Sequence, residues 1–220
     1  MITIEGHTIE TVGVVDDDEE ARRSYTWTLE DAELQVADED GPLGDLEPYA
    51  SDVADRLDAV LCDHHLRVSN YAAFEGVELA ARLYEKKVPA ILCTSWATAE
   101  LDIIRSYRDK VPVLLRPEQL DPGSFTTALE ITIKELQGKF SPQRRPWRTL
   151  IHVVDADDIP RHFFYVRLPS WTSDEVIKLR QANLPPNIRQ RVQRGMYLHA
   201  WVNVGTELVN ELYFRDWEAA

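Results

Sequence analysis

The sequence predicts an α/β domain followed by a small β-rich domain. Through residue 140, short apolar runs alternate with amphipathic stretches of helix length, a pattern typical of a parallel sheet with helices on both faces. The stretch 141–148, Ser-Pro-Gln-Arg-Arg-Pro-Trp-Arg, then interrupts the chain with two prolines and is typical of a linker. Beyond it, apolar and polar residues alternate and predict short strands. We therefore expect domains over residues 1–140 and 149–220.

The balance of acidic and basic residues also changes after residue 140. Residues 1–140 contain 13 basic and 29 acidic residues, whereas residues 141–220 contain 11 basic and 9 acidic ones. The chain as a whole has a formal net charge of −14, which makes nucleic acid an unlikely partner because like charges repel. No apolar stretch approaches the roughly 18 residues of a transmembrane helix, and residues 1–10 lack the pattern of a signal peptide. We therefore expect a cytoplasmic protein without a membrane partner.

Five apolar runs are the predicted strands of the parallel sheet. They contain mainly valine, leucine, isoleucine and alanine, which is typical of strands buried on both faces. They are Thr11–Val15, Glu33–Ala37, Asp58–Cys62, Val88–Cys93 and Val111–Leu115. Cys62 and Cys93 end neighbouring strands and could lie close together, either as buried core residues or as a redox pair.

A helix is expected after each of these strands. The first begins with a run of acids, which favours a helix N-terminus, and Ser51 is a plausible N-cap for the second. In the third, Val77, Leu79 and Leu83 share one face. The predicted helices are Asp18–Leu29, Tyr49–Leu57, Gly76–Lys86, Ala97–Tyr107 and Ser124–Leu136.

The last 80 residues predict a compact barrel or half-open sheet. The expected strands are Leu150–Val154, His162–Leu168, Glu175–Leu179, Met196–Val204 and Glu211–Trp217. In the fourth strand, Leu198 and Ala200 face one way, whereas Tyr197 and Trp201 face the other. A short helix is expected over Pro185–Gly195, ending at the glycine.

Polar residues follow four strands of the predicted parallel sheet. Asp16 and Asp17 follow the first strand, Asp63 the third, Thr94 and Ser95 the fourth, and Arg116 the fifth. Ligands of such sheets bind beyond the carboxyl ends of the strands, so we expect these groups at one edge. Clustered carboxylates repel one another unless a cation joins them, and oxygen ligands suit Mg²⁺. A hydroxyl and a fixed cation would hold the oxygens of a phosphoryl group. The pattern predicts phosphoryl transfer to a carboxylate, with Asp63 as the nucleophile.

These residues resemble the receiver domain of two-component response regulators over about residues 10–138. The matching motifs are Val14-Val15-Asp16-Asp17, Leu61-Cys62-Asp63, Gly76-Val77-Glu78-Leu79, Leu92-Cys93-Thr94-Ser95 and Leu115-Arg116-Pro117. The resemblance implies a receiver-like, flavodoxin-like fold and Mg²⁺ bound by Asp16, Asp17 and Asp63. It implies phosphorylation of Asp63 by a sensor histidine kinase, with Thr94 donating a hydrogen bond to the phosphoryl group. It further implies a signalling phosphoprotein rather than a multiple-turnover enzyme.

Three features depart from the receiver pattern. Arg116 stands where the family usually has lysine; it keeps the positive charge, but it could pair with Asp63 and imitate an occupied site. Val113 stands where a switch aromatic is usual, and the loop that contains 67–75 is about five residues longer than is typical. A working phosphoacceptor and a pseudo-receiver therefore both remain open.

A metal-dependent phosphoesterase is the alternative hypothesis. Asp63-His64-His65 is the tripeptide of the DHH phosphoesterases, but the further motifs of that family are not found. His64 is the only nearby candidate for a general acid or base. We expect it at the rim of the Asp63 site, where it is also a candidate metal ligand.

The C-terminal domain resembles no output module of response regulators that we recognise, and it contains no helix-turn-helix pattern. We expect it to deliver the output by contact with a protein target. A homodimer is possible through the face formed by the fourth helix, fifth strand and fifth helix of the first domain. As an alternative, a basic and aromatic surface for RNA or single-stranded DNA could be formed by Arg189, Arg191, Arg194, Tyr197 and Trp201.

Overall fold

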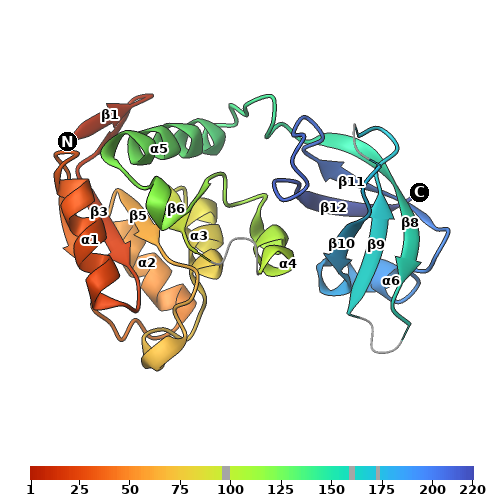
Figure 1. The fold of residues 1–220 in the computed structure, drawn as a ribbon, viewed down its shortest axis with the longest axis horizontal. Helices are drawn as coiled ribbons and strands as arrows, with labels where there is room; N and C mark the ends of the chain where they lie inside the picture. The colour runs from red at the N-terminus through yellow and green to blue at the C-terminus, as the bar shows by residue number, and fades with distance from the viewer. Residues whose placement is uncertain (96–99, 159–161, 172–173) are drawn as a thin grey trace. The chain divides into compact units, whose positions relative to one another are not determined.

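The computed structural model describes residues 1–95, 100–158, 162–171 and 174–220. The chain forms two compact units (Figure 1). One comprises Met1–Ala99 and Lys110–Lys139, and the other comprises Glu100–Asp109 and Phe140–Ala220. The segment Glu100–Asp109 was expected to belong with the first domain, and the contacts that hold it in the second unit are described below.

The first unit is built on a five-stranded parallel sheet with the strand order β4-β3-β5-β6-β7. The strands are β3 (Thr11–Val15), β4 (Gln35–Asp38), β5 (Ala59–Cys62), β6 (Ala90–Cys93) and β7 (Leu114–Leu115). Every residue of β5 and β6 is buried, which is why these strands read as continuous apolar runs. The predicted five-stranded parallel sheet is confirmed.

Helices cover both faces of this sheet (Figure 1). The longer ones are α1 (Glu19–Glu30), α2 (Leu46–Arg56), α3 (Gly76–Glu85) and α5 (Pro122–Leu136). Leu29 of α1 and Phe125 and Leu129 of α5 share one buried cluster with the sheet, so α1 and α5 lie on the same face. On the other face, α2 and α3 pack together, and the Sγ atom of Cys62 lies 3.6 Å from the carbonyl oxygen of Gly76.

An N-terminal hairpin was not predicted. Its strands are β1 (Ile2–Ile4) and β2 (His7–Ile9). Glu5 and Gly6 form the turn, both with positive φ (51° and 83°), as a type I′ turn requires. Ile4 and Ile9 are buried in the cluster that contains α1 and α5, so the hairpin extends that core.

The predicted cap of α2 is wrong. Ser51 lies inside the helix, and its hydroxyl donates to the carbonyl of Glu47 at 2.9 Å. The N-cap is Asp45, and Pro48 falls in the first turn, where a proline removes no helical hydrogen bond. The helix therefore begins three residues before the predicted Tyr49.

The second unit contains an antiparallel sheet with the strand order β10-β9-β8-β11-β12. Its strands are β8 (Trp147–Ala156), β9 (Phe163–Arg167), β10 (Ile177–Arg180), β11 (Tyr197–Val202) and β12 (Phe214–Ala219). Among the described strands, β10 and β12 do not pair with each other, so the predicted β-rich fold is a half-open sheet. β8 begins at Trp147, inside the predicted linker 141–148.

One face of this sheet carries the core of the second unit. Ile151, Phe164 and Leu198 are completely buried, and Ile188 packs over them. Ile188 belongs to α6 (Pro186–Arg189), a single turn. The predicted helix over Pro185–Gly195 is wrong beyond this turn, because Gln190–Arg191 and Arg194–Gly195 form turns instead.

Side-chain hydrogen bonds hold the segment 100–109 in the second unit. The segment contains α4 (Leu101–Ile104) and the 3₁₀ turn η2 (Arg105–Tyr107); the start of the predicted helix Ala97–Tyr107 lies outside the described residues. The Arg105 guanidinium is buried and donates to the carbonyl oxygens of Lys178 (3.0 Å) and Val209 (2.8 Å). Burial lowers the pKa of Arg105 to about 10. Because Lys178 lies in the edge strand β10, Arg105 also covers part of the exposed edge of the sheet.

Three further short 3₁₀ turns complete the described elements. They are η1 (Val68–Asn70), η3 (Pro117–Gln119) and η4 (Gln181–Asn183). Among the described residues, no helix has the length and apolar character that crossing a bilayer requires.

Candidate functional site

Three carboxylates meet at the carboxyl edge of the parallel sheet. Asp16 and Asp17 follow β3, and Asp63 follows β5. These strands are neighbours with Val15 beside Cys62, so the residues after them emerge side by side. Each carboxylate offers an oxygen, and these oxygens lie within 4.8 Å of one another. The three carboxylates therefore lie together at the ends of these strands, as the sequence predicted.

Backbone hydrogen bonds fix two of these carboxylates. The Asp63 N–H donates to the carbonyl of Val15 at 2.9 Å, which extends the β3–β5 ladder by one residue. Oδ2 of Asp63 accepts from the N–H of His65 at 2.9 Å. Oδ1 of Asp16 accepts from the N–H of Asp18 at 2.9 Å. Among the described residues, the other oxygen of Asp63 accepts no hydrogen bond, so it is available to a reacting group.

Arg22 supports the loop after β3, a role that the sequence did not predict. Its Nη1 donates to the backbone carbonyl of Asp16 at 2.7 Å, and its Nε donates to Asp38 at 2.7 Å. Only 6% of Arg22 is exposed. The sequence contains a hint of this role, because Arg22 follows Asp16 by six residues and lies on the first turn of α1, directly after the acidic loop. It is a positioning residue for Asp16.

The electrostatics of the cluster are unfavourable without a cation. Burial, together with the charges of Asp63 and Asp17, raises the pKa of Asp16 to about 7. Burial and the charge of Asp63 also raise the pKa of Asp17. A bound divalent cation would relieve this repulsion. The three ligands are all carboxylate oxygens, the donor type that Mg²⁺ prefers, so the residues present fit this metal.

Gly76 allows α3 to approach the backbone of Asp63. A Cβ at this position would lie 1.6 Å from the carbonyl oxygen of Asp63, which no side chain can tolerate. The Gly76 N–H donates to the carbonyl of His64 at 2.8 Å. The glycine of the matched Gly76-Val77-Glu78-Leu79 motif is thus required by the backbone of the acidic site.

The long loop after Asp63 is anchored to the rest of the first unit. Tyr71 is buried, and its hydroxyl donates to the backbone carbonyl of Glu39. Glu75 and Glu78 form a capping box at the start of α3. Glu75 also accepts from the N–H of Leu66 at 3.1 Å. The extra residues therefore form a folded loop whose end is joined to the helix that packs against Asp63.

Thr94 and Arg116 follow the adjacent strands β6 and β7. Thr94 is completely buried, and its N–H donates to the carbonyl of Leu115 at 2.9 Å. Ser95 is exposed. The Arg116 side chain is 55% exposed, and its ion pair is with Glu118 at 3.9 Å. Among the described residues, Arg116 does not pair with Asp63, so this conformation does not imitate an occupied site.

The two histidines after Asp63 have different environments. His64, which was expected at the rim of the Asp63 site, is completely buried. His65 is partly exposed, and its ring centroid lies 4.9 Å from that of His64. Both residues lie beyond the end of β5, in the loop that leads to η1.

The two cysteines lie on opposite faces of the sheet. Cys62 pairs with Leu92 in the β5–β6 ladder, so these two side chains lie on the same face of the sheet. Cys93 is the next residue after Leu92, and its side chain lies on the opposite face. Both thiols are free and buried. Burial raises the pKa of Cys62 and raises that of Cys93 to about 12. The interpretation as buried core residues therefore fits, and a redox pair does not.

The strand order identifies the fold of the first unit. Counted along its own sheet, the order β4-β3-β5-β6-β7 is 2-1-3-4-5, the flavodoxin-like order of receiver domains, with the ligand site at the point where the order reverses. Asp16, Asp17 and Asp63 stand at that point, between β3 and β5. The first unit has the fold of a receiver domain.

Several solved structures to which this chain is similar are receiver domains. One, from Clostridium thermocellum, is 13% identical, covers 59% of this chain and 98% of its own, and has a TM-score of 0.44. One from Methanospirillum hungatei JF-1 is 16% identical, with 60% and 99% covered and a TM-score of 0.44. The signal receiver domain of an HD domain-containing protein from Pseudomonas fluorescens Pf-5 is 17% identical, with 60% and 91% covered and a TM-score of 0.45. No family model and no curated protein matches the sequence.

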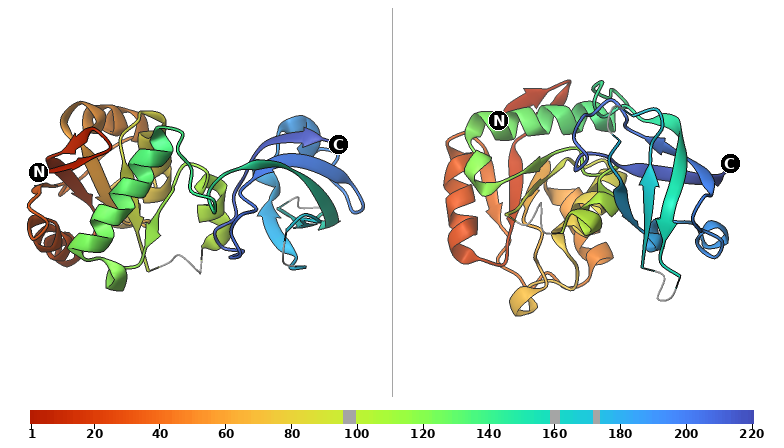
Figure 2. Two further views of the ribbon diagram at one scale, coloured as in Figure 1. Left: turned by 90° about the horizontal axis from the view of Figure 1, so that it is seen from above. Right: turned by 45° about the vertical axis from the view of Figure 1, so that its right-hand side comes forward.

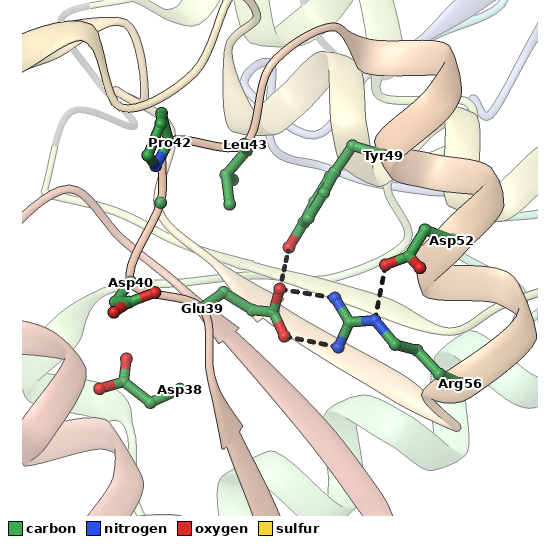
Figure 3. A pocket seen from close by; sticks show the side chains of 9 residues that line it. Asp38, Glu39, Asp40, Pro42, Leu43, Tyr49, Asp52 and Arg56 are labelled. Atoms are coloured by element: carbon green, nitrogen blue, oxygen red, sulfur yellow. Dashed lines mark hydrogen bonds and ion pairs between the residues drawn. The ribbon is translucent and has the colours of Figure 1, made fainter.

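A second concave feature of the receiver unit lies beyond the end of β4 (Figure 3), with a volume of about 280 Å³. The Glu39 carboxylate accepts from both terminal nitrogens of Arg56 at 2.6 Å and from the Tyr49 hydroxyl at 3.0 Å. Nε of Arg56 donates to Asp52 at 2.6 Å. Arg56 thus pairs with two carboxylates, and these contacts attach the loop after β4 to α2.

Proposed function

We propose that the receiver unit is a phosphoacceptor, in which Asp63 takes a phosphoryl group while Asp16, Asp17 and Asp63 hold Mg²⁺. The observation that carries the proposal is the clustering of these three carboxylates, with oxygens within 4.8 Å of one another, at the reversal point of the sheet. The raised pKa of Asp16 supports it, because such a cluster is stabilised by a cation.

The chemistry assigned to Asp63 is a single displacement at phosphorus. The carboxylate oxygen that accepts no hydrogen bond attacks the phosphorus atom of the donor, and the bond from phosphorus to the leaving group breaks. The leaving group departs with the electron pair, and an aspartyl phosphate remains. Mg²⁺ would neutralise charge on the transferring oxygens. The N–H of His65 holds the second oxygen of Asp63 and so orients the nucleophile.

Thr94 and Arg116 are the proposed partners of the phosphoryl group. Thr94 follows β6, which neighbours β5, and its hydroxyl is thus expected at the same sheet edge. Arg116 is exposed and weakly held at 3.9 Å, so its rotation toward a new dianion costs little. A guanidinium can contact phosphate through two nitrogens, which supports a working site in spite of the missing lysine.

The partner that we propose is a sensor histidine kinase, the usual donor for receiver domains, and we propose a cytoplasmic location. The second unit would deliver the output through a bound target. The segment that carries α4 and η2 lies between Thr94 and Arg116 in the sequence, and Arg105 bonds it to the backbone carbonyls of Lys178 and Val209 in the second unit.

The experiment must separate a phosphoacceptor from the alternative phosphoesterase. The full chain is incubated with Mg²⁺ and either acetyl phosphate or p-nitrophenyl phosphate, and both intact mass and product release are followed. A phosphoacceptor gains one phosphoryl group per chain from acetyl phosphate and does not turn over the phosphoester. Asp63→Asn should abolish the gain, whereas Asp55→Asn, at an exposed position on α2, should leave it intact. Sustained release of nitrophenol that depends on Asp63 would instead favour the phosphoesterase.

A further inference from the structure

The outer face of the second unit's sheet is rich in aromatic and basic side chains. Residues paired across antiparallel strands point to the same side, so the register defines this face, opposite the buried core. We call it the outer sheet face. Its members are Arg148, Leu150, His152 and Asp155 of β8; Phe163, Tyr165 and Arg167 of β9; Lys178 and Arg180 of β10; Tyr197, His199 and Trp201 of β11; and Arg215 and Glu218 of β12.

Aromatic rings on this face are exposed to solvent. Tyr197 is 49% exposed and Trp201 is 37% exposed. The ring of Tyr197 stacks on that of His152, with centroids 4.9 Å apart and planes 20° apart. The solvent side of an antiparallel sheet is usually polar, so rings of this size are unexpected unless they contact a ligand. The stacked pair, which spans β8 and β11, and Trp201 of β11 form flat platforms on this face.

Positive charge surrounds these rings. On the described strands, the outer sheet face carries five arginine and lysine side chains and two carboxylates. Nζ of Lys178 lies 3.7 Å from the centroid of the Phe163 ring. Arg148 is the cross-strand neighbour of Trp201, although its guanidinium also pairs with Glu218 at 2.9 Å. The charge of this face is thus opposite in sign to the −14 of the whole chain.

Arg189 does not join the aromatic side chains with which the sequence grouped it. Arg189 of α6 donates to the backbone carbonyls of Ala182 and Leu184, so it closes a turn. α6 packs on the core side of the sheet through Ile188, opposite Tyr197. The cations that accompany the aromatic rings come from the strands themselves.

Flat rings beside cations are complementary to a strand of unpaired nucleotides. Each base has an apolar face that stacks on an aromatic ring, and each phosphate carries a negative charge. A duplex hides the faces of its bases, so it would use the cations alone. An acidic peptide would also use the cations, but its Asp and Glu side chains carry no aromatic ring to stack on Trp201. A purely apolar partner would leave Arg167 and Lys178 without a complement.

We propose that the outer sheet face of the second unit binds single-stranded nucleic acid, with bases stacked on Tyr197 and Trp201 and phosphates held by Arg167, Lys178 and neighbouring cations.

The test measures binding of the full chain to fluorescein-labelled oligothymidine, oligouridine and a DNA hairpin duplex by fluorescence anisotropy. Both single strands should bind more tightly than the duplex, and their relative affinities show whether DNA or RNA is preferred. Stacking of one base contributes about 1 kcal/mol or more, so Tyr197→Ala and Trp201→Ala should each weaken binding about fivefold or more. The matched control is Trp27→Ala, since Trp27 is 62% exposed on α1 of the other unit.

Salt dependence tests the cations separately. The logarithm of the association constant should fall with that of the salt concentration, and Arg167→Ala and Lys178→Ala should each reduce the slope by about 0.7. Arg23→Ala, at an exposed position of α1, should not change it. Circular dichroism of each variant checks that it is folded. The proposal is overturned if no single strand binds at low salt. It is also overturned if Trp201→Ala has no effect, or if polyglutamate competes as well as oligothymidine; either result would indicate an acidic protein partner.

Discussion

Replacing Asp16 by asparagine should stabilise the receiver unit when no metal is bound. The ordinary pKa of an aspartate is 3.8, and in the folded chain burial and the neighbouring carboxylates raise the pKa of Asp16 to about 7. The folded state therefore binds the proton more tightly than the unfolded state. As the pH rises from about 4 to about 7, the wild-type chain loses stability, and above pH 7 the loss is complete.

The size of this effect follows from the pKa. At about 1.4 kcal/mol for each tenfold change in proton affinity, the loss at pH 8 is at most roughly 4 kcal/mol. Asparagine has no charge to bury. Its Oδ1 can still accept the hydrogen bond from the N–H of Asp18, which is 2.9 Å long in the wild type. Asp16→Asn should therefore raise the free energy of unfolding by up to about 4 kcal/mol at pH 8, and by less at pH 5.

The assay is urea unfolding in the presence of a chelator, read by hydrogen exchange on peptides of the receiver unit so that the second unit does not interfere. Asp55→Asn, an exposed substitution on α2, serves as the control and should change little. Adding Mg²⁺ should stabilise the wild type, since a ligand that binds only the folded state does so by mass action, and it should stabilise Asp16→Asn much less. Equal or lower stability of Asp16→Asn at pH 8 would refute the electrostatic reasoning.

Three further substitutions test other parts of the structure. Gly76→Ala should destabilise the receiver unit by about 2 kcal/mol or more, because the added Cβ overlaps the Asp63 carbonyl oxygen. Urea unfolding measures this loss, and a change in the free energy of unfolding below about 0.5 kcal/mol would contradict the prediction. Arg105→Met should leave two partly buried carbonyls without this donor and cost the second unit roughly 2 kcal/mol or more. Faster hydrogen exchange in residues 100–109 is the readout, and unchanged exchange would be inconsistent with the anchoring role. Arg116→Lys should retain phosphorylation of Asp63 by acetyl phosphate, as Arg116 is exposed and weakly paired; loss of labelling would show that the guanidinium is specifically required.

The parallel sheet was predictable because its signal is local. Residues of β5 and β6 are buried on both sides, so each strand is a continuous apolar run followed by a polar group. The N-terminal hairpin has strands of three residues, which are too short for a periodic pattern. The start of α2 was missed because Ser51 is a good capping residue in isolation, whereas the choice between it and Asp45 depends on packing of the whole helix.

The candidate site was predictable to the level of which strand ends meet. The identities of Asp16, Asp17 and Asp63 and the order of the strands are sufficient to bring them together. The burial of His64 and the position of the Arg116 side chain depend on the loop backbone and on side-chain rotamers, which no sequence pattern specifies. The placement of residues 100–109 with the second unit depends on hydrogen bonds from Arg105 to residues more than seventy positions away.

Locating the phosphoryl group on the chain tests the central claim most directly. The full chain is treated with acetyl phosphate and Mg²⁺, reduced with borohydride, which converts an aspartyl phosphate to homoserine, and then digested and sequenced by mass spectrometry. The account predicts homoserine at position 63, dependent on Mg²⁺ and reduced in Asp17→Asn. Unmodified Asp63 after this treatment, in a chain that is folded and supplied with Mg²⁺, would contradict the account.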